Sequence, residues 1–143
     1  MSYPSLDDTV SVAPQITPDE VTRLAREGIR MIICNRPDDE VPADLGSDRI
    51  GAACEAAGIA FVANPFGPGG LRRETIDRQA QAMAAADGPV VAYCASGTRS
   101  AVLWAFAAVQ SGTVAPDVAA RALAEAGYSI PGLEGQLATV ATG

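Results

Sequence analysis

Short apolar runs and helical stretches alternate along the first two thirds of the chain. Three runs of strand length are almost wholly apolar, at residues 29–34, 59–64 and 89–94, and a glycine that can end a helix stands just before each of them. Strands that are apolar on both faces are typical of a parallel sheet that helices cover on both sides. The pattern therefore predicts an α/β fold of three layers, with a mainly parallel sheet flanked by helices.

Local signals place the helices around these runs. Thr17, Pro18 and Glu20 form a capping box with proline at the first helical position. The helix that they open is expected to run to residue 27, where Gly28 ends it. Further helices are expected over residues 47–57, 73–86, 100–110, 116–126 and 133–141, and a short extended segment over residues 10–13. The last three helices would form an extra helical part at the C-terminal end.

The composition is that of one folded domain. The chain has 143 residues, of which 48% are hydrophobic and 19% are charged, and this length can bury one core but not two. The longest apolar candidate, residues 101–109, is too short to span a bilayer, so no membrane partner is expected. The N-terminal residues lack the basic and apolar regions of a secretory signal, which favours a cytoplasmic location.

Charge and missing residue types exclude several functions. The formal net charge is -7, from ten basic and seventeen acidic residues, and an acidic surface repels nucleic acid. The chain has no histidine, which excludes Cys-His and Ser-His catalytic pairs and histidine-ligated metal sites. The three cysteines form no CxxC pair and are expected to be reduced thiols. No metal and no cofactor are expected.

Three loops are expected to share one crevice, because ligands of such sheets bind at the carboxyl ends of the strands. The loops have the sequences NRPDDE after the first apolar run, NPFGPGG after the second and CASGTRS after the third. In the first loop, Arg36 either adds positive charge to the crevice or pairs locally with Asp38 or Asp39. In the second loop, Phe66 could form an aromatic wall for a substrate, and an ordinary connection is the simpler interpretation.

The loop that begins at Cys94 has the composition of an anion-binding site. Four small residues follow the cysteine: Ala95, Ser96, Gly97 and Thr98. Such a loop can turn its backbone N–H groups inward around an anion, and the helix behind it adds free N–H groups. Both favour the thiolate form of Cys94, a nucleophile that needs no histidine. Arg99 supplies a planar fork for two oxygens of an oxyanion, and Ser100 could donate a hydrogen bond to the thiolate.

Each cysteine also has a purely structural interpretation. Cys94 could be a small buried residue that ends a strand, with Arg99 only capping the helix or forming a salt bridge. The order of strand, cysteine, small residues, arginine and apolar helix favours the catalytic interpretation. Cys34 also ends a strand, and here a buried core cysteine is favoured over a resolving thiol opposite Cys94. Cys54 lies among alanines within a helix and is interpreted as a packing residue.

Four segments of the chain, SVAPQITPDEV, MIICNRPDDE, PFGPGGL and YCASGTRSAVLWA, resemble the bacterial beta-lactamase hydrolase-like protein, phosphatase-like domain family. The resemblance covers nearly the whole chain. It implies a protein tyrosine phosphatase-like fold, related to that of protein tyrosine and dual-specificity phosphatases, with Cys94 as the nucleophile. Members of this family are in places also described as sulfur transferases.

The chain departs from phosphatases of this superfamily in the cysteine loop and upstream of it. Tyr93 stands where a histidine usually precedes the cysteine, and four residues instead of five separate the cysteine from Arg99. Ala95 occupies a position where the family often has arginine. No aspartate lies between Ala63 and Arg73 to serve as a general acid.

These departures favour sulfur transfer over phosphate ester hydrolysis. Hydrolysis requires a proton for the leaving alkoxide, whereas sulfite leaves a sulfane-sulfur donor such as thiosulfate without one. The preferred prediction is a cysteine-dependent, rhodanese-like sulfurtransferase that works through a Cys94 persulfide. The alternative is a phosphatase that works through a Cys94 phosphoenzyme, and a second alternative is a non-catalytic module that binds an anion or a protein partner. The expected ligand is a small oxyanion or a sulfane-sulfur donor.

Overall fold

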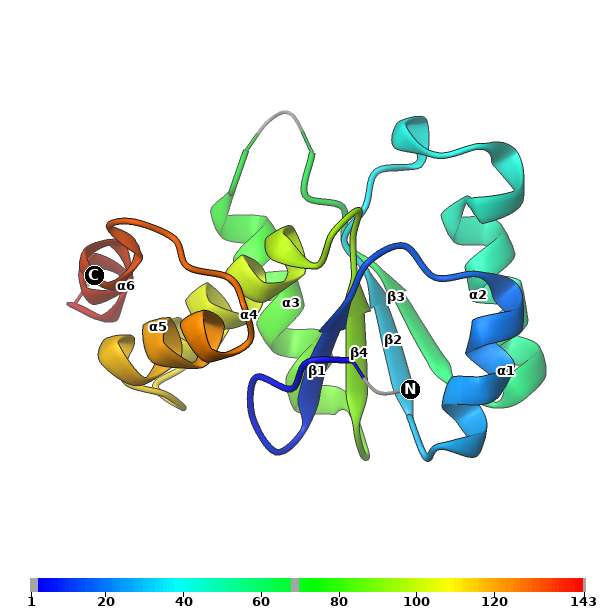
Figure 1. The fold of residues 1–143 in the computed structure, drawn as a ribbon, viewed down its shortest axis with the longest axis horizontal. Helices are drawn as coiled ribbons and strands as arrows, with labels where there is room; N and C mark the ends of the chain where they lie inside the picture. The colour runs from blue at the N-terminus through cyan, green and yellow to red at the C-terminus, as the bar shows by residue number, and fades with distance from the viewer. Residues whose placement is uncertain (1–2, 68–69, 143) are drawn as a thin grey trace.

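Four parallel strands form the centre of the fold, in the order β1-β4-β2-β3 (Figure 1). The computed structural model describes residues 3–67 and 70–142. The strands are β1 (Val10–Ala13), β2 (Met31–Cys34), β3 (Ala60–Ala63) and β4 (Val90–Tyr93). Their register places Ala13, Tyr93 and Cys34 side by side at the carboxyl end of the sheet. The loops after β2, β3 and β4 therefore start at one edge, as the strand pattern predicts.

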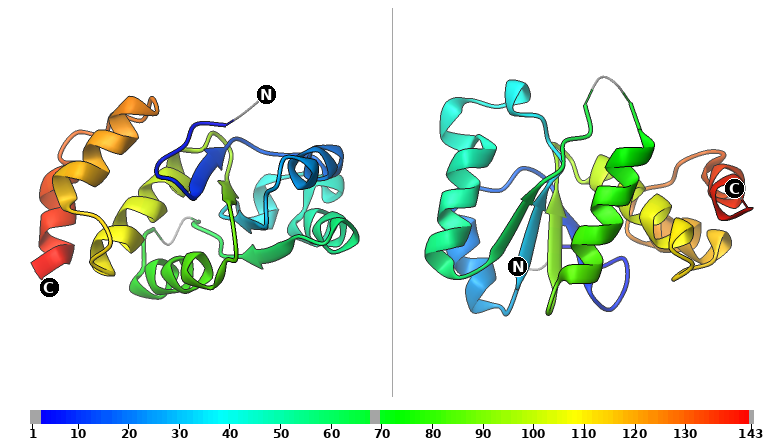
Figure 2. Two further views of the ribbon diagram at one scale, coloured as in Figure 1. Left: turned by 90° about the horizontal axis from the view of Figure 1, so that it is seen from below. Right: turned by 180° about the vertical axis from the view of Figure 1, so that it is seen from behind.

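Helices cover both faces of this sheet (Figures 1 and 2). They are α1 (Pro18–Arg26), α2 (Ser47–Ala57), α3 (Arg73–Ala85), α4 (Thr98–Gln110), α5 (Pro116–Glu125) and α6 (Leu133–Thr142), with short 3₁₀ turns η1 (Asp38–Glu40) and η2 (Ala43–Leu45). Helices α1 and α2 pack together on one face, and α3 and α4 pack together on the other. Helices α5 and α6 pack against α4. This arrangement confirms the three-layer prediction with an extra helical part at the C-terminal end.

Successive strand residues alternate between two hydrophobic clusters. Val12 and Ile33 belong to the cluster that includes α3 and α4, and Ile32 and Val91 belong to the cluster that includes α1 and α2. Complete burial of one isoleucine contributes about 1.5–3 kcal/mol to folding. β3 differs because it lies at the edge of the sheet and its end residues are exposed, so the prediction of a strand covered on both faces is wrong for β3. No helix in the described part of the chain is long and apolar enough to cross a membrane.

Glycine ends the first two helices, as predicted. Gly28 and Gly58 have φ angles of 95° and 77°, a left-handed conformation that side chains oppose. The capping box that begins at Thr17 is present at the other end of α1. The strand after α1 is shorter than predicted, because the N–H of Ile29 donates to the carbonyl of Leu24 at 3.1 Å and closes the helix instead of joining the sheet.

Candidate active site

Cys94 lies at the carboxyl end of β4, where the chain turns into α4. Its side chain is fully buried, and the backbone N–H of Gly97 donates to its Sγ atom at 3.1 Å. Gly97 has a φ of 94° and directly precedes the first helical residue, Thr98. This left-handed turn starts the helix earlier than the predicted Ser100. The thiol therefore lies beside the free N–H groups at the start of a helix, as the loop composition predicts.

The outer surface of this loop faces solvent and the C-terminal helices. Ala95, Ser96 and Thr98 are exposed, and the hydroxyls of Ser96 and Thr98 lie 3.1 Å apart. Tyr128 contacts the loop from the segment between α5 and α6: its hydroxyl donates to the carbonyl of Ser96 at 3.3 Å. Tyr128 is not predictable from the sequence, because no local pattern links it to a loop so far away in the chain. The binding roles of the loop residues stay predictions.

The guanidinium of Arg99 already holds a carboxylate. Its two terminal nitrogens donate to the two oxygens of Glu40 at 2.7 and 3.0 Å, and one of them also donates to the carbonyl of Phe66 at 2.8 Å. The hydrogen bond from Arg99 holds the pKa of Glu40 below its ordinary value, against the opposing effect of burial. The ring of Phe66 packs against the cluster that includes α3 and α4, and its role as a substrate wall stays a prediction.

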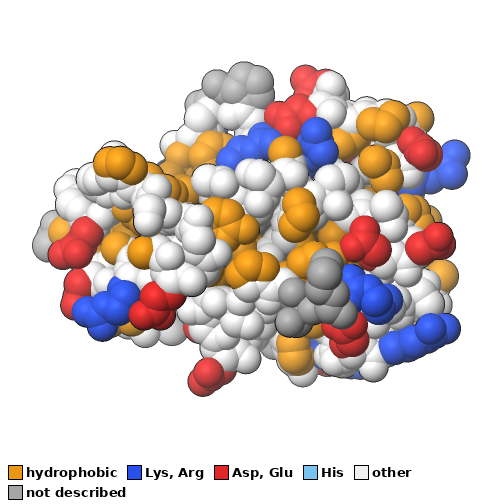
Figure 3. Space-filling view, in the orientation of Figure 1, with side chains coloured by type: hydrophobic (Ala, Val, Ile, Leu, Met, Phe, Trp, Pro, Cys, Tyr) orange, Lys and Arg blue, Asp and Glu red, His pale blue; other side chains and the backbone are white. Residues whose placement is uncertain are grey.

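Arg36 binds the same carboxylate. Its guanidinium donates to a side-chain oxygen of Glu40 at 3.3 Å, to the backbone carbonyl of Glu40 at 3.1 Å and to Gln15 at 3.2 Å. The expectation of a local partner holds, but the partner is Glu40 and not Asp38 or Asp39. Figure 3 shows basic and acidic side chains next to one another at the top of the molecule, where the strands end in Figure 1. Glu40 therefore bridges two arginines at the predicted crevice.

Ser100 belongs to a buried polar network instead of contacting the thiol. Its hydroxyl donates to the side-chain oxygen of Asn35 at 2.9 Å, so the predicted hydrogen bond to Cys94 is replaced by one to the end of β2. The amide of Asn35 donates to Gln79 at 2.9 Å, and the amide of Asn64 donates to the same Gln79 oxygen at 2.8 Å. The network ties α3 and α4 to the loops after β2 and β3. Any catalytic role of Ser100 stays a prediction.

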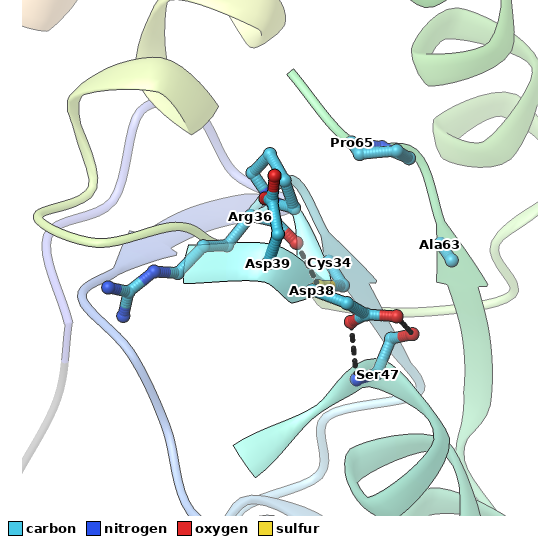
Figure 4. A pocket seen from close by; sticks show the side chains of 8 residues that line it. Cys34, Arg36, Asp38, Asp39, Ser47, Ala63 and Pro65 are labelled. Atoms are coloured by element: carbon cyan, nitrogen blue, oxygen red, sulfur yellow. Dashed lines mark hydrogen bonds between the residues drawn. The ribbon is translucent and has the colours of Figure 1, made fainter. Parts of the chain in front are cut away.

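Cys34 lines a cavity of about 350 Å³, together with Arg36. Its lining includes Cys34, Pro37 and Pro65, and Figure 4 shows the Asp38 carboxylate bound to the backbone N–H and hydroxyl of Ser47 there, at 2.8 and 2.9 Å. Burial raises the pKa of the Cys34 thiol, which donates to a backbone carbonyl. A protonated, buried thiol agrees with the core interpretation, and the resolving role stays a prediction.

Cys54 is a packing residue, and the acidic side chains of the described residues form no metal site. Cys54 is fully buried in the cluster with α1 and α2, where burial raises its pKa to about 11, so its interpretation as a packing residue is confirmed. Within residues 3–67 and 70–142, no group of three histidine, cysteine, aspartate or glutamate side chains is arranged to hold a metal ion. The chemistry that the site offers is that of a thiol, backbone N–H groups and two arginines.

Known proteins are similar to this chain in sequence and in fold. Residues 3–113 match the family described as beta-lactamase hydrolase-like protein, phosphatase-like domain. A beta-lactamase hydrolase-like protein of Xylella fastidiosa is 32% identical over 117 residues, which cover 82% of this chain. The match covers 27% of that protein, so the chain spans about a quarter of the length of this curated relative.

Solved structures match nearly the whole chain. A candidate phosphatase from Neisseria meningitidis is 30% identical with a TM-score of 0.81, and the match covers 98% of this chain and 99% of that one. PTPMT1 is 20% identical with a TM-score of 0.76, over 99% of this chain and 94% of its own, and this likeness shows the fold alone. The sequence match and these neighbours confirm the predicted protein tyrosine phosphatase-like fold. The chain belongs to the beta-lactamase hydrolase-like protein, phosphatase-like domain family.

Proposed function

We propose that the chain hydrolyses phosphate monoesters through a covalent Cys94 phosphoenzyme. The observation that carries this proposal is the bidentate contact between Arg99 and Glu40, at 2.7 and 3.0 Å. The two carboxylate oxygens stand in for two oxygens of a phosphoryl group, which is also negatively charged and can accept both hydrogen bonds of the guanidinium. Arg99 belongs to the first turn of α4, directly after the loop that holds the Cys94 sulfur, so an oxyanion bound by its guanidinium would be next to the nucleophile.

The reaction follows from these groups in two displacements. The Cys94 thiolate attacks phosphorus, the bond from phosphorus to the ester oxygen breaks, and the alcohol leaves with a proton taken from solvent. Water then attacks the phosphocysteine, the sulfur–phosphorus bond breaks, and inorganic phosphate and the thiolate are released. The loop N–H groups and Arg99 stabilise the charge on the phosphoryl oxygens in both steps. Because no aspartate lies between Ala63 and Arg73, aryl esters with good leaving groups should be the better substrates.

Sulfur transfer is the second candidate, and the absence of an aspartate between Ala63 and Arg73 is the observation that favours it. Sulfite is a good leaving group that needs no proton, whereas the alkoxide of a phosphate ester needs one. In this reaction the thiolate attacks the sulfane sulfur of thiosulfate, the sulfur–sulfur bond breaks, and sulfite leaves with the electron pair. The product is a Cys94 persulfide. Membership of a phosphatase-like family and the likeness to a candidate phosphatase support phosphate chemistry over this alternative, although the sequence alone favours sulfur transfer.

Hydrolysis of an aryl phosphate, measured in parallel with thiosulfate treatment, tests the proposal. We expect release of the phenol with multiple turnovers, and a mass increase of one phosphoryl group on Cys94 in acid-quenched protein. Treatment with thiosulfate should then leave the mass of the intact protein unchanged. Addition of one sulfur atom without phosphate release would establish sulfur transfer instead, and no reaction with either reagent would indicate a binding module.

Replacing Glu40 by glutamine is expected to strengthen anion binding. The neutral amide no longer competes for the Arg99 guanidinium, so inhibition by inorganic phosphate should tighten about fivefold. Because the Glu40 pKa is lowered, the wild-type carboxylate stays charged even at a pH where an ordinary glutamate begins to take up a proton. Acid therefore releases Arg99 only as the pH falls through the lowered pKa, and not near neutrality.

The measurement is the inhibition constant for phosphate at neutral pH. Glu55→Gln is the matched control, because it removes the same charge from an exposed position on α2 and should leave the constant unchanged. Weaker inhibition in Glu40→Gln would contradict the competition and would show that Glu40 orients Arg99 for its substrate.

A further inference from the structure

Tyr128 has a position fixed by the end of α5. Gly127 has a φ of 102°, and the N–H of Tyr128 donates to the carbonyl of Leu123 at 2.8 Å while that of Gly127 donates to Ala124 at 3.1 Å. These two bonds form a Schellman motif, which ends a helix and directs the next residue. Leu123 is fully buried. The backbone of Tyr128 is therefore held firmly relative to the helical layer.

The ring of Tyr128 lies against the cysteine loop. Its hydroxyl donates to the carbonyl of Ser96 at 3.3 Å. A Cβ atom placed on Gly97 would lie 2.3 Å from this hydroxyl oxygen and 3.1 Å from the ring carbon that bears it. Gly97 thus serves two purposes, because its φ of 94° is left-handed and its missing side chain makes room for the tyrosine.

The hydroxyl of Tyr128 and the sulfur of Cys94 bind opposite ends of one peptide group. The carbonyl of Ser96 accepts from Tyr128, and the N–H of Gly97 in the same peptide donates to Cys94 at 3.1 Å. A hydrogen bond to a carbonyl polarises its peptide and strengthens the donor at the other end, by about 10–30% per bond in condensed-phase estimates. A stronger donor stabilises a thiolate more than it stabilises a thiol.

We propose that Tyr128 is a positioning residue that activates Cys94 through the Ser96–Gly97 peptide. Burial, followed by the nearby Cys94, raises the pKa of Tyr128, so its hydroxyl keeps the proton that it donates at neutral pH. Tyr128 lies beyond the residues 3–113 that match the family, so the C-terminal helices take part in the chemistry of the site. This activation would partly offset the weaker positive potential of a loop with Ala95 in place of arginine.

The variant Tyr128→Phe tests the proposal, because it keeps the ring and removes the hydroxyl. The rate of Cys94 alkylation by iodoacetamide is measured against pH by mass analysis of the Cys94 peptide. We expect the midpoint of this profile to move up by about half a pH unit, with about threefold slower alkylation below the midpoint. Tyr3→Phe is the control, since it removes a hydroxyl that binds Glu20, and its profile should equal that of the wild type.

An unchanged profile in folded Tyr128→Phe would overturn the proposal. If that variant does not fold, the coupling is measured from the other side, with Tyr128 unchanged. The Tyr128 phenol is titrated by NMR in the wild type and in Cys94→Ser. The coupling requires the Tyr128 pKa to fall when the thiolate is removed, and no change would equally overturn it. The inference rests on Cys94 being the nucleophile of the proposed function. Neither readout uses a substrate, so a failure to hydrolyse phosphate esters is distinguishable from a failure of this coupling.

Discussion

Replacing Cys94 by serine is expected to lower kcat/KM for aryl phosphate hydrolysis by about 10⁴-fold or more. A serine hydroxyl is a weak nucleophile unless a neighbouring base takes its proton, and the chain has no histidine to do so. The loop N–H groups stabilise a thiolate but cannot remove the proton of an alcohol. The serine variant should therefore bind phosphate and form no covalent intermediate.

Two further cysteine variants control this result. Cys54→Ala removes a thiol that is buried in α2 within the other hydrophobic cluster, and it should retain activity within about twofold. Cys34→Ser keeps a group that can donate to the carbonyl of Arg36 and should also remain active. Loss of activity in Cys34→Ser together with activity in Cys94→Ser would reverse the assignment of the nucleophile.

The second large effect is on stability: Gln79→Ala is expected to lower the free energy of unfolding by about 3 kcal/mol. Gln79 is fully buried. Its side-chain oxygen accepts from Asn35 at 2.9 Å and from Asn64 at 2.8 Å, and its amide donates to Asn35 at 3.2 Å. Alanine would leave these partners buried without their acceptor and donor. Denaturation by urea measures the loss, which should also lower Tm by about 10 °C.

Gln81→Ala is the matched control for this prediction. It makes the same substitution on the same helix at an exposed position, and the change should be within about 0.5 kcal/mol. Equal effects of the two variants would mean that helix propensity, and not the buried network, determines the cost. Since the network also holds Ser100 through Asn35, the Gln79 variant should lose activity at temperatures where it is still folded.

The fold could be predicted from the sequence because its signals are local. The capping box that begins at Thr17 and the left-handed Gly28 and Gly58 depend on a few neighbouring residues. The strand ends were also predictable, since apolar runs of this length stop where the chain leaves the sheet. The predicted strand ends also place Cys94, because a loop that joins a parallel strand to a helix starts at the carboxyl end of that strand.

The contacts of the site could not be predicted because they join distant segments. Glu40 and Arg99 are 59 residues apart, and Ser100 and Asn35 are 65 apart. Glu40 is one of three consecutive acidic residues in NRPDDE. The turn η1 determines that Glu40, and neither of its two acidic neighbours, reaches the guanidinium of Arg99. Tyr128 gave no signal, since its role depends on how the C-terminal helices pack. Contacts between such distant residues are determined by the tertiary structure and cannot be recognised from the spacing of residues along the sequence.

The strand order has one more consequence for the site. β4 and β2 are neighbours, yet the chain leaves β2 toward the face with α2 and leaves β4 toward the face with α4. Adjacent loops that diverge in this way open a crevice at a topological switch point. The cysteine loop and the segment that carries Glu40 therefore come from separate connections, neither of which crosses the sheet. Exchanging residues 36–46, which leaves the buried Asn35 in place, is therefore expected to change specificity while the nucleophile and its scaffold stay as they are.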